Sequence, residues 1–82
     1  MSVTIQVRSG PRLLERPATF LGTRQGMGAL YLVMDPYEWR MVPPPIRLAL
    51  VDGGGMAYRI WYVESAPRWA QRLYREHNEG GE

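Results

Sequence analysis

The stretch GGGMAYRIWYVESAPRWAQRLYREH, residues 53–77, decides the fold. Residues 56–64 are rich in aromatic and β-branched side chains, which are typical of a β-strand. Both faces of this segment are largely apolar, which predicts an interior strand covered on both sides. Asp52 and the three glycines before the segment favour a tight reversal from a preceding strand at 46–51, because glycine adopts positive φ without steric cost.

The second half of the stretch predicts one amphipathic helix from about residue 65 to 78. Ser65 is suited to be its N-cap, and Pro67 falls in the first turn, where its missing N–H is tolerated. Apolar side chains recur at helical spacing and form a single stripe. We expect this stripe to pack on a sheet, because a helix of about a dozen residues is marginal alone in water. The stripe consists of Trp69, Ala70, Leu73, Tyr74 and His77.

The chain before this unit predicts short strands separated by glycine and proline turns. Residues 2–8 alternate apolar and polar side chains, which indicates a half-buried strand. Residues 12–16 are ambiguous between a helical turn and a strand, and Pro43, Pro44 and Pro45 form a rigid extended connector. The expected strands are residues 2–8, 18–23, 29–34, 38–42, 46–51 and 56–64.

These elements predict a mainly β domain with one C-terminal α-helix packed on the sheet. Short connections favour an antiparallel meander that curls into a small barrel, with a topology of the SH3-like or OB-like kind. An open antiparallel sheet with the helix on one face is the alternative. The length of 82 residues predicts a single domain, 1–82, with residues 79–82 as a frayed tail.

Composition argues against several chemistries. There is no cysteine and one histidine, His77, so we expect neither a metal site nor a cofactor, and we expect no enzyme. The glycine-rich segment 22–28 lacks the lysine of a phosphate-binding loop and is interpreted as a hairpin turn. No signal peptide and no apolar run of membrane-spanning length is visible, so we expect a cytoplasmic protein, of the producing cell or of a host, with no membrane partner.

The basic residues are the first clue to a partner. All ten are arginine, which reflects either genome composition or selection for planar, bidentate contacts to phosphate or carboxylate. The formal net charge is +2, which is modest for a dedicated nucleic-acid binder. Aromatic, arginine and methionine side chains are also the types enriched in protein interfaces.

We therefore expect a non-enzymatic binding module that acts through a protein partner, as an adaptor, an assembly subunit or a virus-type inhibitor of host machinery. The alternative is a small β-barrel that binds nucleic acid through arginine and aromatic side chains, with Arg8, Arg12 or Arg16 joining the helix arginines. A homodimer is a further alternative. The candidate partner-binding residues are Tyr37, Trp39, Arg40, Arg68, Arg72 and Arg75.

Overall fold

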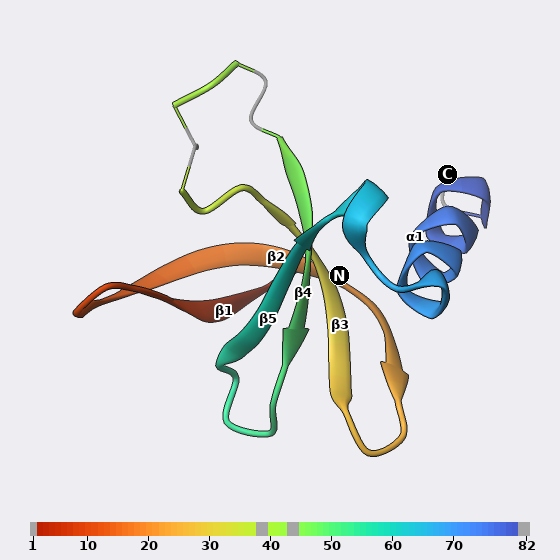
Figure 1. Ribbon diagram of the computed structural model, residues 1–82, viewed down its shortest axis with the longest axis horizontal. Coiled ribbons are helices and arrows are strands. Elements are labelled where there is room, and N and C mark those ends of the chain that lie inside the picture. Colours follow the sequence, from red (N-terminus) through yellow and green to blue (C-terminus); the bar gives the residue numbers. More distant parts are fainter. Residues whose placement is uncertain (1, 38–39, 43–44, 81–82) are drawn as a thin grey trace.

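The computed structural model describes residues 2–37, 40–42 and 45–80, which form one antiparallel sheet and a C-terminal α-helix (Figure 1). Each strand pairs with the next along the chain, in the order β1-β2-β3-β4-β5. The mainly β architecture with a C-terminal helix is therefore confirmed. The elements are β1 (Ser2–Ser9), β2 (Arg12–Arg24), β3 (Gly28–Met34), β4 (Ile46–Val51), β5 (Ala57–Tyr62), the 3-10 helix η1 (Val63–Ser65) and α1 (Arg68–Gly80).

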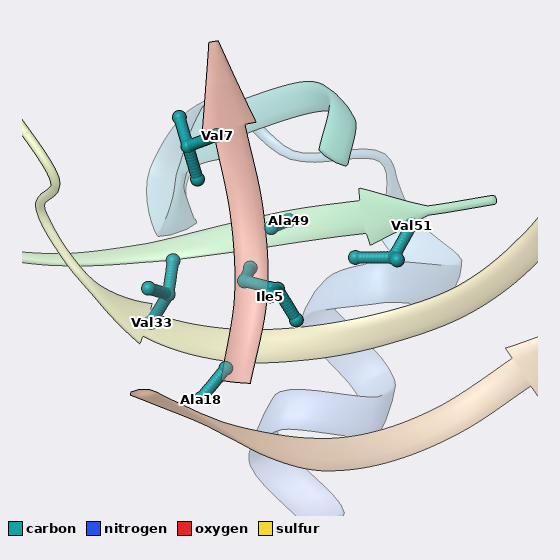
Figure 2. Packing of buried hydrophobic residues seen from close by; sticks show 6 residues of the cluster. All are labelled: Ile5, Val7, Ala18, Val33, Ala49 and Val51. Carbon is teal, nitrogen blue, oxygen red and sulfur yellow. The ribbon is translucent and has the colours of Figure 1, made fainter. Parts of the chain in front are cut away.

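The sheet curls into a half-barrel, and its hollow is filled by apolar side chains. Figure 2 shows β1 crossing in front of β3 and β4, with buried side chains between the strands and the helix behind them. Inward and outward positions alternate along the strands except where the register shifts on β2 and β5, as the two-residue period of a strand requires. We call the buried residues of the hollow the inner cluster: Ile5, Val7, Ala18, Val33, Ala49 and Val51.

The helix α1 covers part of the opposite face of the sheet, as the apolar stripe predicts. Here the helix approaches β2 closely: a Cβ placed on Gly22 would lie 3.1 Å from Leu73 Cδ1. His77, expected in the stripe, is exposed. We call the residues buried beneath α1 and η1 the outer cluster: Leu30, Leu48, Ala66 and Ala70, with Leu21, Leu32, Trp61, Val63, Trp69, Leu73 and Tyr74 packed against them.

The long strand β2 settles the ambiguity at residues 12–16, which are extended and pair with β1. Pro17 lies inside β2, but pairing with β3 begins only at Ala18, so the proline occupies the end of that ladder, where its missing N–H is tolerated. The strand expected at 38–42 is not found in its described part, since residues 40–42 are turn and bend and 38–39 lie outside the described residues.

The strand β5 differs from the prediction in its position. It is an edge strand of the meander and not an interior strand, and Tyr58 and Tyr62 on it are exposed. A register shift places Ala57 opposite Val51 and Arg59 opposite Leu50, so Tyr58 is the extra residue of a β-bulge. Because of this bulge, Ala57 packs against the inner cluster, whereas a regular strand would have kept it on the Trp61 face.

The helix begins later than its cap signal predicts. Ser65 ends η1 and does not cap α1, while the Pro67 carbonyl accepts hydrogen bonds from the amides of Ala70 and Gln71, both at 3.0 Å. The side-chain amide of Gln71 also donates to the Val63 carbonyl at 2.8 Å, which ties α1 to η1. Residues 79–80, expected in a frayed tail, are the last helical residues, and 81–82 lie outside the described residues.

Candidate functional site

A groove opens where the half-barrel remains unclosed, between the edges of β1 and β5. In the described chain these edges are joined at one position, where the Gln6 amide donates to the Gly55 carbonyl at 3.0 Å beside a parallel bridge from Gln6 to Met56. Beyond this bridge lies a cavity of about 480 Å³, which we call the β1–β5 groove. It is lined by Val7, Arg8, Tyr37, Arg47, Met56, Ala57, Tyr58, Arg59 and Ile60.

The wall of the groove is fixed by a buried ion pair. Asp35 is fully buried at the end of β3, and its Oδ2 accepts a hydrogen bond from Arg47 Nε at 2.6 Å. Its Oδ1 accepts a hydrogen bond from the Tyr37 amide at 2.7 Å, and the Asp35 amide donates to the Pro45 carbonyl at 2.7 Å. Asp35 therefore links the two ends of the segment between β3 and β4 and holds Tyr37 at the groove.

Two aromatic rings lie against the arginine of this pair. The Arg47 guanidinium carbon lies 3.9 Å from the centroid of the Tyr62 ring and 5.5 Å from that of Tyr37. Cation–π contacts of this kind restrict the orientation of the guanidinium. Together with the carboxylate, they offset the free-energy cost of burying its charge. The Tyr37 hydroxyl also donates to the Arg8 carbonyl at 3.4 Å, so the aromatic wall reaches across to β1.

The rim of the groove is positively charged. Arg8 on β1 and Arg59 on β5 are exposed, and neither forms an ion pair with any residue that the structure describes. Among the described residues the lining contains no carboxylate, and the buried Asp35 beside it is already bonded to Arg47. Tyr37 and Tyr58 expose 46% and 49% of their surface, and the Tyr58 hydroxyl donates to the Met27 carbonyl in the turn between β2 and β3. The groove thus offers flat aromatic surface and an excess of about two positive charges, which suits an anionic ligand.

The structure separates the predicted partner-binding residues. Tyr37 lines the groove, whereas Arg40 is exposed in the following turn and is not among the lining residues. Trp39 lies outside the described residues. Arg68, Arg72 and Arg75 are exposed on α1, away from the groove lining, and Arg72 lines a second cavity.

Sequence reasoning missed most of the groove. Arg8 was grouped with the helix arginines as part of a patch, but it lies in the groove instead. One sequence signal could have identified Arg47 as part of a site. It occupies an inward position of the apolar strand β4, where a buried charge requires a partner. Tyr58 and Arg59 could not have been found, because the bulge at Tyr58 and the edge position of β5 are tertiary features.

A separate apolar strip extends beyond the helix on the outer face of the sheet. Met34 and Ile46, at the adjoining ends of β3 and β4, are 52% and 36% exposed. Beside them lies a small cavity of about 180 Å³ that reaches across to β2. Exposed apolar surface of this kind often marks an interaction site, so the homodimer, given above as an alternative, stays untested, with this strip as its candidate contact. The cavity is lined by Pro17, Ala18, Thr19, Leu32, Met34 and Ile46.

The described residues contain no cluster of side chains that could hold a metal ion. No three His, Cys, Asp or Glu side chains among them lie close enough together to hold a metal ion. His77 is exposed near the C-terminal end of α1, and it is not among the residues that line the groove. In the same part of the chain, no helix has both the length and the apolar character needed to cross a bilayer. A comparison with known protein families, curated proteins and solved structures finds no match to this chain.

Proposed function

We propose that the protein is a binding module that holds an extended, acidic segment of a partner protein in the β1–β5 groove. The observation that carries this proposal is the unclosed sheet edge, which presents backbone donors and acceptors of β5 beside exposed tyrosines and arginines. An extended peptide adds to such an edge by main-chain hydrogen bonds, which supply affinity without regard to sequence.

Side chains around the groove supply the selectivity. Successive side chains of an added strand point to opposite sides, so alternate residues of the peptide would face the cavity. Apolar residues would pack on Met56 and the ring of Tyr58, while carboxylates at the rim would pair with Arg8 and Arg59. Because Arg47 is already engaged by Asp35, the two exposed arginines carry the charge preference.

The test is fluorescence anisotropy with a labelled peptide that alternates valine and glutamate. The proposal expects this peptide to bind, and a peptide that alternates valine and lysine to bind at least about tenfold more weakly. Arg8→Glu and Arg59→Glu should each weaken binding of the acidic peptide by a similar factor, because both residues are exposed and the fold does not depend on them.

The matched control is Arg68→Glu, which changes the charge equally at an exposed position of α1 outside the groove lining. It should change the affinity for the acidic peptide by no more than about twofold, since an exposed charge that does not contact the ligand is screened by salt. Equal binding of the acidic and basic peptides would overturn the proposal, as would loss of binding in the Arg68 variant equal to that in the Arg59 variant.

Single-stranded nucleic acid is the second candidate for the same groove. Tyrosines beside arginines, here Tyr37 and Tyr58 beside Arg8 and Arg59, are the combination that stacks bases and holds phosphates. This candidate predicts that an oligonucleotide competes with the peptide and that its affinity falls steeply with salt. An oligonucleotide that leaves the anisotropy unchanged at low salt would exclude it.

A further inference from the structure

A second cavity, of about 470 Å³, lies between the β2–β3 hairpin and α1. Among the described residues it shares no lining residue with the β1–β5 groove, and the proposed function makes no use of it. We call it the hairpin–helix pocket. It is lined by Thr23, Arg24, Gln25, Trp69, Arg72 and Leu73.

One of its arginines is held by an aromatic ring. The Arg24 guanidinium carbon lies 4.9 Å from the centroid of the Trp69 ring, within the range of a cation–π contact. Trp69 is half-buried and packs against the outer cluster, so the ring is a fixed support. A guanidinium has five N–H donors, so those that do not face the ring stay available to an acceptor.

The second arginine converges on the same pocket from the helix. Arg72 follows Trp69 by three residues, which places both on one side of α1, and its side chain is exposed. Within the described residues neither Arg24 nor Arg72 has an ion-pair partner, and the pocket lining contains no carboxylate. Two positive charges in one pocket repel each other. A bound anion attracts both and so offsets this repulsion.

The remaining polar groups fit the same ligand. The lining also includes Thr23 and Gln25, and the side-chain amide of Gln25 can donate hydrogen bonds. Two guanidinium groups with additional neutral donors match the several acceptor oxygens of a phosphate better than the two of a carboxylate. We propose that the hairpin–helix pocket binds a phosphate group, carried either by a small phosphate compound or by a nucleic-acid backbone.

The experiment follows the indole N–H of Trp69 and the Nε–H of Arg24 by ¹H–¹⁵N NMR during titration. Inorganic phosphate, pyrophosphate and a short single-stranded DNA are added separately at constant ionic strength. The proposal expects saturable shifts of both signals. Pyrophosphate as the tighter ligand would indicate a small phosphate compound, and the oligonucleotide as the tighter ligand would indicate a nucleic-acid backbone.

Arg24→Gln and Arg72→Gln should each weaken binding by about tenfold, as expected for one lost charge-assisted contact. The matched control is Arg75→Gln, which removes an exposed arginine from the same helix but not from the pocket. The proposal is overturned if none of the three ligands shifts the two signals. It is also overturned if Arg75→Gln weakens binding as much as Arg72→Gln, because the helix would then act as a diffuse cationic face.

Discussion

The buried carboxylate of Asp35 accepts a hydrogen bond from Arg47 Nε at 2.6 Å, and this pair closes the segment that joins β3 to β4. Asp35 is the last residue before the segment turns away from the sheet, and Arg47 is the second residue of the returning strand. The same carboxylate orients Tyr37 through its amide. A single ionic contact thus couples the stability of the half-barrel to the shape of the β1–β5 groove.

Removal of the carboxylate should be strongly destabilising. We expect Asp35→Ala to lower the free energy of unfolding by about 3 kcal/mol, because it removes the carboxylate that compensates the largely buried charge of Arg47. Urea denaturation measures the change. The control Glu64→Ala removes an exposed carboxylate from η1 and should shift the value by no more than about 0.5 kcal/mol. In a double-mutant cycle, Arg47→Ala should be far less costly once Asp35 is absent, and strict additivity would contradict the pairing.

The start of β3 requires glycine. Gly28 has a φ of +120°, and a Cβ there would lie 2.4 Å from the Val51 carbonyl oxygen. We expect Gly28→Ala to destabilise the fold by at least about 2 kcal/mol, since backbone strain and a clash with β4 act together. Gly26→Ala is the control: its φ is +81°, but the space around it is open, so about 1 kcal/mol is expected. Thermal unfolding of both variants is the measurement, and equal losses would show that the contact with Val51 is unimportant.

Leu73 holds the helix on the sheet. Its methyl groups reach the space above Gly22, and it packs against the outer cluster. We expect Leu73→Ala to lower the free energy of unfolding by about 2–3 kcal/mol through lost burial and a residual cavity. Arg75→Ala, on the exposed side of α1, should change it by no more than about 0.5 kcal/mol. Denaturation midpoints in the reverse order would mean that α1 packs through its other face.

The turn between β4 and β5 is held by a side chain. Asp52 Oδ1 accepts hydrogen bonds from the amides of Gly54 at 2.9 Å and Met56 at 3.1 Å. We expect Asp52→Ala to destabilise the protein by about 1 kcal/mol, whereas Asp52→Asn retains an acceptor oxygen and should lose less than half of that. Chemical denaturation compares the two. If asparagine were as damaging as alanine, the negative charge and not the hydrogen-bonded turn would be the stabilising feature.

The sequence by itself determined the elements that depend on neighbouring residues. Alternation predicted β1, short segments between glycine and proline turns predicted β3 and β4, and helical spacing predicted the buried face of α1 through Leu73. These features follow from φ preferences and side-chain period, which act over a few residues. The segment 22–28 was accordingly predicted as a hairpin turn, and Gly26 and Gly28 adopt positive φ there.

Only the tertiary structure decided which strand lies at an edge and which charges meet. The apolar composition of β5 suggested an interior strand, but the curl of the sheet leaves it at the opening of the half-barrel. Its bulge at Tyr58 is set by pairing with β4. The contacts of Asp35 with Arg47 and of Arg24 with Trp69 join residues 12 and 45 positions apart. Such contacts depend on strand order and register, which arise from packing the whole sheet and have no local sequence signal.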